Sequence, residues 1–214
     1  MLFMPDETAR LYLLTPPLME ATAFAPLLEA AMAAGDVACV LLHLATQDAA
    51  QVRKIAQALA EIVQAHGAAL LINADPAVSI PSPADGVHVR GSGALLNGLL
   101  KTVQPDRIVG IGGLKTKDDA MEAGESGVDY LMFGEPAADG FVPPVAQTIE
   151  RAQWWAEIFN VPCVAYAHRL PDVAALSATG ADFIALGEAV WNDPRGPAAV
   201  VHEAQMLLHP LPVR

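Results

Sequence analysis

Histidines, acidic residues and basic residues stand at or just after the ends of the apolar segments of this chain. They are His43, His88, Lys115, His168, Arg169 and Glu188, and with them stand the polar or small residues Thr15, Asn73, Asp75 and Gly187. A histidine titrates near neutral pH and can act as a general base, whereas lysine and arginine neutralise anions. A carboxylate such as Asp75 is a suitable ligand for Mg²⁺. These residue types indicate a site for a small molecule.

The segments that carry these residues alternate regularly between apolar and helical patterns. The expected strands cover residues 10–15, 37–44, 68–73, 86–89, 107–111, 128–133, 161–167 and 183–186. The expected helices cover residues 19–34, 48–66, 94–104, 116 to about 124, 145–159, 171–179 and 197–208, and a proline-rich connection covers 76–83. Continuous apolar runs are typical of parallel strands buried on both faces.

Eight strands in alternation with helical links predict an α/β fold, a (β/α)8 TIM barrel that forms a single domain over residues 1–214. A doubly wound open sheet is the alternative, but no glycine-rich fingerprint follows the first strand. In such a barrel, ligands bind at the C-terminal ends of the strands, where all the residues named above are expected.

Three aspartates are expected at the opposite end of the barrel. Asp85, Asp129 and Asp182 each precede a strand in a repeated pattern of a small residue, Asp and an apolar segment. Together they resemble a catalytic set of carboxylates. Because they precede their strands, they are instead predicted to be turn and cap residues at the N-terminal end of the barrel, which contributes stability and not catalysis.

The composition limits the partners of the chain. The formal net charge is −12 and the isoelectric point is about 4.7, which disfavours nucleic acid and anionic membrane as partners. The expected partner is a small-molecule ligand at the C-terminal face of the barrel. The N-terminus carries no secretory pattern and no apolar run reaches transmembrane length, so we expect a cytoplasmic protein. Cys39 and Cys163 lie in apolar runs and are expected to be buried, reduced thiols.

Several segments, in order along nearly the whole chain, resemble the thiamine phosphate synthase family, including its thiazole tautomerase branch. They are Leu11-Tyr12-Leu13-Leu14-Thr15, Leu71-Ile72-Asn73, Ala84-Asp85-Gly86-Val87-His88, Ile108-Val109-Gly110, Gly127-Val128-Asp129-Tyr130 and Gly180-Ala181-Asp182. The resemblance implies a transferase of thiamine biosynthesis that joins a pyrimidine diphosphate to a thiazole phosphate, with Mg²⁺ bridging the diphosphate. It also implies that Asn73 orients an aminopyrimidine and that Asp75 is a metal ligand.

The chain departs from the family where the diphosphate and the metal would bind. The family's Gln-x-Arg-x-Lys after the second strand is replaced by Leu41-Leu42-His43-Leu44-Ala45, and its Asn-Asp is replaced by Asn73-Ala74, with Asp75 one position later. The second magnesium aspartate falls near Gly93, the tautomerase histidine falls at Leu114, and the loop after the sixth strand is Glu135-Pro136-Ala137-Ala138-Asp139-Gly140. Ala167-His168 replaces a pair of glycines, and the negatively charged Glu188 follows Gly187 where a phosphate would bind.

Most retained residues keep more than one interpretation. Asn73 either orients an aminopyrimidine, as the resemblance implies, or closes the end of its strand through a turn bond. His43 is a phosphate donor, a general base or a plain rim residue, and His88 lies either packed inside the barrel or at its rim. Lys115, with Lys117, supplies charge to a phosphate or forms a solvated helix start. The His168-Arg169 pair either contacts an anion or has no role in binding. Glu188 is a general base or pairs with Arg169 or Arg195.

Two functions follow from these observations. The first is the family's transferase with a rearranged site, in which Asn73 and Asp75 contact the pyrimidine or Mg²⁺, and His43, Lys115 and Arg169 replace the lost cations. The second is a catalytically inactive or repurposed member that binds another small molecule or acts through protein interaction. The site residues favour the second function and the whole-chain resemblance favours the first. A homodimer is compatible with the family and with the Trp154-Trp155 pair on an outer helix.

Overall fold

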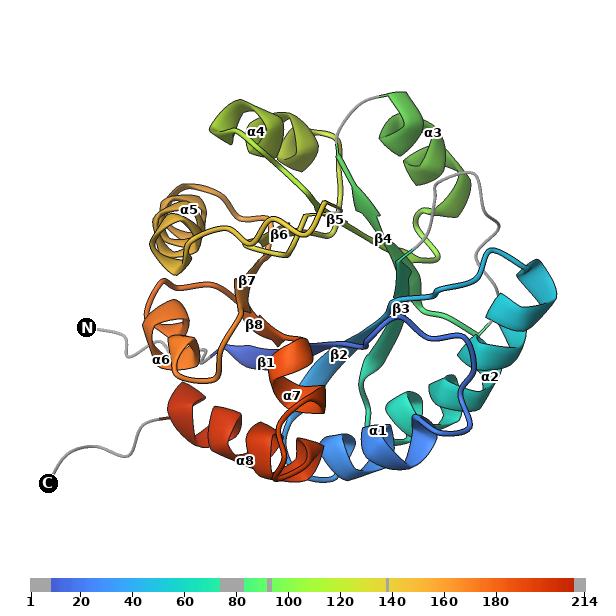
Figure 1. The fold of residues 1–214 in the computed structure, drawn as a ribbon. Helices are drawn as coiled ribbons and strands as arrows, with labels where there is room; N and C mark the ends of the chain where they lie inside the picture. The colour runs from blue at the N-terminus through green and yellow to red at the C-terminus, as the bar shows by residue number, and fades with distance from the viewer. Residues whose placement is uncertain (1–8, 74–82, 92–93, 138, 210–214) are drawn as a thin grey trace, which may run out of the picture.

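Eight parallel strands close into a barrel in sequence order, which confirms the predicted fold and excludes the open sheet. The structure is a computed structural model and describes residues 9–73, 83–91, 94–137 and 139–209. The strands are β1 (Arg10–Leu14), β2 (Val37–Leu42), β3 (Ala69–Asn73), β4 (Gly86–Arg90), β5 (Ile108–Gly112), β6 (Tyr130–Phe133), β7 (Cys163–Ala167) and β8 (Phe183–Leu186). The β1–β8 pairing closes the ring, which Figure 1 shows along its axis.

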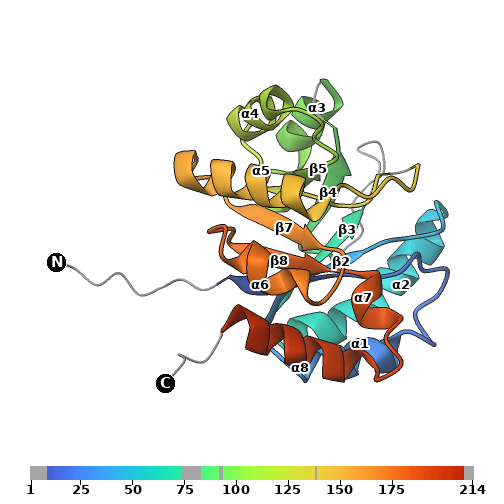
Figure 2. The same ribbon diagram turned by 60° about the vertical axis from the view of Figure 1, so that its left-hand side comes forward.

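The helices form a ring outside the barrel. They are α1 (Ala25–Met32), α2 (Ala49–Ala65), α3 (Ala94–Val103), α4 (Lys117–Glu125), α5 (Val145–Ile158), α6 (Asp172–Ser177), α7 (Glu188–Trp191) and α8 (Pro197–Leu208). Figure 2 shows this ring from the side, with α1 and α8 packed next to each other where the two ends of the chain meet. The apolar strand residues therefore have water on neither face, as their continuous hydrophobicity predicts.

Two helix predictions needed correction. The first helix begins at Ala25 and not at Met19, because Pro26 occupies its first turn, where a proline is tolerated, and Leu18 instead bridges to Leu44. The short helix α7 after β8 was not predicted, because four residues are too few to show a helical period. The predicted connection over 76–83 falls mostly outside the described residues.

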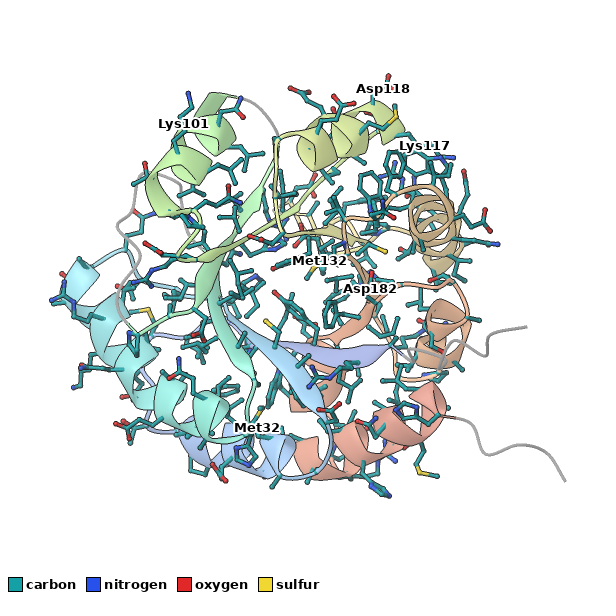
Figure 3. The ribbon with its side chains drawn as sticks, turned by 180° about the vertical axis from the view of Figure 1, so that it is seen from behind. Met32, Lys101, Lys117, Asp118, Met132 and Asp182 are labelled. Carbon is teal, nitrogen blue, oxygen red and sulfur yellow. The ribbon has the colours of Figure 1, made fainter. Side chains whose placement is uncertain are left out.

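The interior of the barrel is filled by side chains from alternate strand positions. They are Tyr12, Leu14, Cys39, Leu41, Leu71, Tyr130, Met132, Val164, Tyr166 and Ala185. Figure 3 places Met132 near the barrel axis. A glycine at position 110 leaves room for the Tyr130 ring, since a Cβ atom there would lie 1.9 Å from Cζ of Tyr130. The core thus carries aromatic hydroxyl groups, which need hydrogen-bond partners.

The three repeated aspartates cap strands at the end of the barrel opposite the predicted site, as expected. The carboxylate of Asp85 accepts a hydrogen bond from the backbone N–H of Leu70 at 2.7 Å. Asp129 accepts from Val109 at 2.7 Å, and Asp182 accepts from Cys163 at 2.8 Å. Each aspartate therefore satisfies a donor at the start of the preceding strand.

Both cysteines are buried free thiols, as predicted. Burial raises the pKa of Cys39 above its ordinary value and raises that of Cys163 to about 12. Neither thiol is therefore an activated nucleophile at neutral pH. Among the helices that the structure describes, none has the length and apolar character needed to span a bilayer.

Candidate functional site

A cavity of about 660 Å³, here called the mouth cavity, opens at the C-terminal end of the barrel. Its walls come from the ends of strands around most of the ring. It is lined by Leu14, Thr15, Pro16, Pro17, His43, Asn73, Arg90, Pro136, Ala137, Gly140, Val142, Tyr166, His168, Gly187 and Glu188. The closed topology thus brings together six predicted site residues, namely Thr15, His43, Asn73, His168, Gly187 and Glu188.

The other predicted residues lie elsewhere. His88 is fully buried in β4 and lies below the mouth cavity rather than at its rim. Lys115 lines a second cavity. Arg169 is mostly exposed and pairs with Asp172 at 2.7 Å. Asp75 lies outside the described residues.

Thr15 and His43 are joined at the edge of the mouth cavity. The backbone N–H of His43 donates to Oγ1 of Thr15 at 3.0 Å, and the Thr15 hydroxyl donates to the carbonyl of Pro16 at 2.9 Å. Nε2 of His43 is buried and has no hydrogen-bond partner among the described residues. Burial and the nearby Arg90 lower the pKa of His43, so its ring is neutral at pH 7. His43 is therefore a polar contact and a weak replacement for a phosphate-binding cation.

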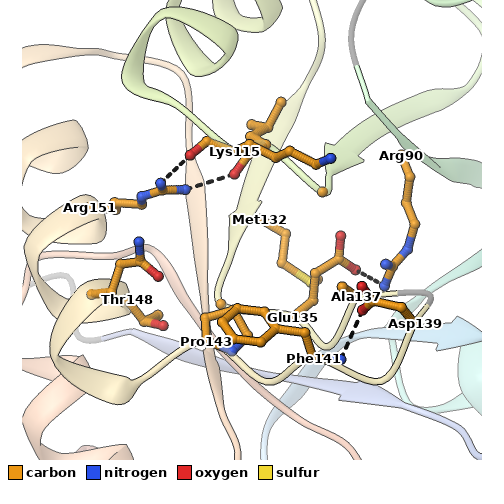
Figure 4. Close-up of a pocket in the computed structure, with 14 residues that line it drawn as sticks. Arg90, Lys115, Met132, Glu135, Ala137, Asp139, Phe141, Pro143, Thr148 and Arg151 are labelled. Atoms are coloured by element: carbon orange, nitrogen blue, oxygen red, sulfur yellow. Dashed lines mark hydrogen bonds and ion pairs between the residues drawn. The ribbon is translucent and has the colours of Figure 1, made fainter.

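A chain of buried polar groups runs along the barrel axis toward this end. The hydroxyls of Tyr12 and Tyr130 are hydrogen-bonded at 2.8 Å, and the Tyr130 hydroxyl is hydrogen-bonded to Nδ1 of His88 at 2.8 Å. Nε2 of His88 lies 3.6 Å from Oε2 of Glu135. Arg90 donates to the same Oε2 at 2.9 Å (Figure 4). The chain ends at a carboxylate buried beneath the mouth.

Glu135 is ionised although it is only 5% exposed. Burial alone would raise its pKa, but its interactions with the neighbouring His88, Arg90 and His43 side chains outweigh burial, so the pKa lies below its usual 4.5. One glycine makes room for this side chain, and another turns the backbone just before it. A Cβ atom at Gly112 would lie 2.0 Å from Oε1 of Glu135, and Gly134 turns the chain with a φ of +87°.

The second cavity, here called the side cavity, has a volume of about 310 Å³ and lies between the ends of β5 and β6 and the first turn of α5. It is lined by Arg90, Gly113, Leu114, Lys115, Met132, Gly134, Glu135, Ala137, Asp139, Phe141, Pro143, Gln147, Thr148 and Arg151 (Figure 4). Arg151 donates to the carbonyls of Leu114 and Lys115, so it fixes the loop after β5. The two cavities share Arg90 and Ala137.

The start of α7, where a phosphate would bind, is filled by the protein itself. The Tyr166 ring lies at this end of β7, and burial raises the pKa of Tyr166 to about 12. A Cβ atom at Gly187 would lie only 2.4 Å from the Tyr166 hydroxyl. His168 is hydrogen-bonded through Nε2 to the carbonyl of Gly134 at 2.8 Å. Aromatic and imidazole side chains thus occupy this part of the rim.

The predicted pairing of Glu188 with Arg169 or Arg195 is wrong. Arg169 pairs with Asp172, which lies three residues ahead in the first turn of α6. Arg195 binds Asp193 at 2.9 Å and Glu203 at 2.7 Å. Other carboxylates therefore hold both arginines, and Glu188 lines the mouth cavity instead.

The described part of the mouth does not bring a cluster of metal-ligating side chains together, and Asp75, the predicted ligand, lies outside the described residues. Among the residues that the structure describes, no group of three or more histidine, cysteine, aspartate or glutamate side chains is arranged to hold a metal ion. Glu135 is the buried carboxylate at this end, and Arg90 and His88 already face its Oε2. A Mg²⁺ ion prefers several oxygen ligands, which these nitrogen-rich surroundings do not supply.

The fold defines a TIM barrel with a cavity at the C-terminal ends of its strands, and comparison with known proteins gives its family. Residues 11–190 match the family model of thiamine monophosphate synthase. The thiamine-phosphate synthase of Rhodospirillum centenum is 40% identical over 194 residues, which cover 90% of this chain and 94% of that protein. The synthase of Hyphomonas neptunium is 34% identical, with 97% of each chain covered.

A solved structure agrees in fold. The thiamine phosphate pyrophosphorylase of Pyrococcus furiosus superposes with a TM-score of 0.77 at 19% identity, covering 93% of this chain and 95% of that chain. The chain therefore belongs to the thiamine monophosphate synthase family, as its sequence motifs indicate.

Sequence reasoning did not assign a site role to Arg90, Glu135, Tyr130 or Tyr166. A signal for two of them exists, because Arg90 ends β4 and Glu135 follows the glycine that ends β6. The two tyrosines stand in otherwise apolar strands, at positions that face the barrel interior. Their hydroxyl groups would have pointed to a buried polar network.

Proposed function

We propose that this protein is a ligand-binding member of its family that takes a small, uncharged heterocycle in the mouth cavity. The pyrimidine or thiazole part of a thiamine precursor is a ligand of this kind. In this function the protein does not catalyse diphosphate transfer at ordinary enzyme rates. The observation that carries it is the ion pair of Arg90 with the buried Glu135, at 2.9 Å.

This ion pair matters because a diphosphate needs cations that are free to bind it. Arg90 lines the mouth cavity, yet its guanidinium is committed to Glu135 and to the carbonyl of Pro136. His43 is neutral at pH 7 because its pKa is lowered by burial. Glu188 adds a negative charge at the opposite wall. The described walls thus favour a neutral ligand over a diphosphate.

The shape of the cavity suits a flat, mainly apolar ligand with a few polar atoms. Its volume of about 660 Å³ lies within the usual range of small-molecule sites. Leu14, Pro16, Pro17 and Val142 supply apolar contacts. Asn73, His43 and His168 supply hydrogen-bonding groups that fix the orientation of a heterocycle.

The family's transfer reaction is the second candidate function. It is favoured by 40% identity to a protein named thiamine-phosphate synthase over 94% of that protein's length. In this case His43, Lys115 and Arg169 replace the missing cations, while Asn73 and Asp75 contact the pyrimidine or Mg²⁺. The metal role of Asp75, the homodimer and the cytoplasmic location stay predictions, as does the absence of nucleic acid and membrane partners.

One experiment separates the two functions. The protein is incubated with the pyrimidine diphosphate, the thiazole phosphate and Mg²⁺, with the Rhodospirillum centenum synthase as positive control, and thiamine phosphate is quantified. We expect no product above background. We also expect the pyrimidine alcohol to bind at least as tightly as its diphosphate in a calorimetric titration. Turnover of about 1 s⁻¹ or more, within the ordinary enzyme range, would establish the transferase instead.

A further inference from the structure

Two buried polar atoms in the side cavity have no partner within the described residues. They are Oε1 of Glu135 and Oγ1 of Thr148, on side chains that line the same cavity. Glu135 is 5% exposed and Thr148 is 1% exposed, so bulk water does not solvate them freely. Buried polar groups in proteins nearly always have hydrogen-bond partners, and exceptions need an explanation.

We propose that the side cavity is a second binding subsite, which takes a neutral ligand group with an N–H donor, such as an amino group on a nitrogen heterocycle. The donor binds Oε1 of Glu135, and the Thr148 hydroxyl is the second polar contact. The inference concerns a cavity beside the mouth cavity and holds whichever ligand the mouth cavity takes.

The orientation of Glu135 prepares it for such a ligand. Its Oε2 atom is held by Arg90 at 2.9 Å and faces Nε2 of His88 at 3.6 Å. The Cα atom of Gly112 lies against Oε1 without a side chain that would displace it. One oxygen is thus fixed by the protein and the other is left for a donor from outside. An acceptor that is fixed in advance loses little entropy on binding.

The charges around the cavity select a neutral donor over a cation. Glu135 and Asp139 supply negative charge, whereas Arg90, Lys115 and Arg151 supply positive charge to the same lining. Arg90 already compensates the carboxylate of Glu135. A second cation would therefore meet repulsion that a neutral N–H group does not.

The remaining walls favour a single ring. Leu114, Met132, Phe141 and Pro143 supply apolar surface (Figure 4). The volume of about 310 Å³ is at the lower end of the usual range for small-molecule sites. An amino-substituted ring meets both requirements, with its flat face on the apolar wall and its N–H toward Glu135.

The test uses 2-aminopyrimidine and pyrimidine, which differ only in the amino group. The protein is labelled with ¹³C at the methionine methyls, and the Met132 signal is assigned with a Met132→Leu variant. We expect 2-aminopyrimidine to shift the Met132 signal and to bind at least about threefold more tightly than pyrimidine, as expected for one added hydrogen bond. Equal binding of the two rings, or no shift at Met132, would overturn the inference.

Variants locate the contact. We expect Glu135→Gln to weaken 2-aminopyrimidine binding about tenfold, because the acceptor loses its charge, and Thr148→Val to weaken it about threefold. Glu157→Gln removes one negative charge from an exposed position of α5, the helix that carries Thr148, outside both cavity linings, and serves as the control, with binding unchanged. Thermal unfolding confirms that each variant is folded. Should Glu135→Gln not fold, Thr148→Val decides: wild-type affinity in that variant, or in a folded Glu135→Gln, contradicts the subsite.

Discussion

At the scale of single residues, the molecule is distinguished by an ionised carboxylate, Glu135, beneath the mouth of the barrel. An ion at this depth is tolerated only when its charge is compensated. Arg90 provides this compensation at Oε2, and Nε2 of His88 faces the same atom at 3.6 Å. Because all three groups are tied together, we expect the effects of substituting them to be strongly non-additive.

Arg90→Met should destabilise the protein by about 3 kcal/mol, because Glu135 is left as an uncompensated buried charge. This figure is at the low end for buried pairs, since the Arg90 side chain is 28% exposed. The double variant with Glu135→Met should recover most of the loss. Urea unfolding measures both. Arg10→Met is the control, since its pair with Asp36 is exposed and should contribute less than about 1 kcal/mol. Additive losses in the double variant would contradict this account.

The aspartate caps allow a second test at the same scale. Asp182→Ala leaves the N–H of the buried Cys163 without its acceptor, so we expect a loss of about 1–3 kcal/mol in the free energy of unfolding. Asp182→Asn retains an oxygen acceptor and should lose less. Hydrogen exchange at the Cys163 amide should accelerate most in the alanine variant. Wild-type stability in Asp182→Ala would show that the cap is dispensable.

At the scale of elements, β5 is shaped to admit side chains from β6. Gly110 faces the Tyr130 ring and Gly112 faces Glu135. Tyr130 in turn holds His88 of β4 through its hydroxyl. The missing side chains of β5 thus make room for the chain of polar groups that runs along the barrel axis.

Gly110→Ala tests this packing. The new Cβ atom would lie 1.9 Å from Cζ of Tyr130, so the ring must move and its bonds to Tyr12 and His88 must break. We expect a destabilisation of about 3 kcal/mol in chemical unfolding. Gly98→Ala in α3 is the matched control, because a Cβ atom there meets no atom within 4 Å. That change should stabilise the protein by up to about 1 kcal/mol. Similar effects of both changes would argue against the packing role of Gly110.

The elements were largely predictable, whereas the site was predictable only in position. Apolar runs that end in glycine or a polar residue identify strands such as β7 and β8, because burial on both faces leaves a pattern in the sequence. The position of His43 and Asn73 at the C-terminal ends of their strands also places them at the mouth. The partner of Glu135 was not predictable, because Arg90 lies 45 residues away and the two meet only when the barrel closes.

At the scale of the whole molecule, the two ends of the barrel have different roles. Carboxylates at one end satisfy backbone donors, and the other end holds ionised and neutral polar groups around two cavities. The second end should therefore govern how stability depends on pH. Folding lowers the pKa of His43 below 6.5 and that of Glu135 below 4.5. For both groups the unfolded state takes up a proton first as the pH falls, so acid favours unfolding.

We therefore expect the free energy of unfolding to be highest above pH 6.5 and to fall first below that value, as His43 titrates. It should fall again below pH 4.5, as Glu135 is protonated in the unfolded state and then in the folded state. Urea unfolding of the wild type and of Glu135→Gln between pH 3 and 8 isolates the second step. Exposed carboxylates with lowered pKa values, such as those of Asp36 and Asp193, are present in both proteins and cancel in the difference. The two curves should converge as the pH falls below 4.5, because the wild type loses the contribution that the variant lacks at every pH. Parallel curves across the whole range would mean that Glu135 has the same pKa in the folded and unfolded states. The description of Glu135 as a buried carboxylate whose charge is compensated would then be wrong.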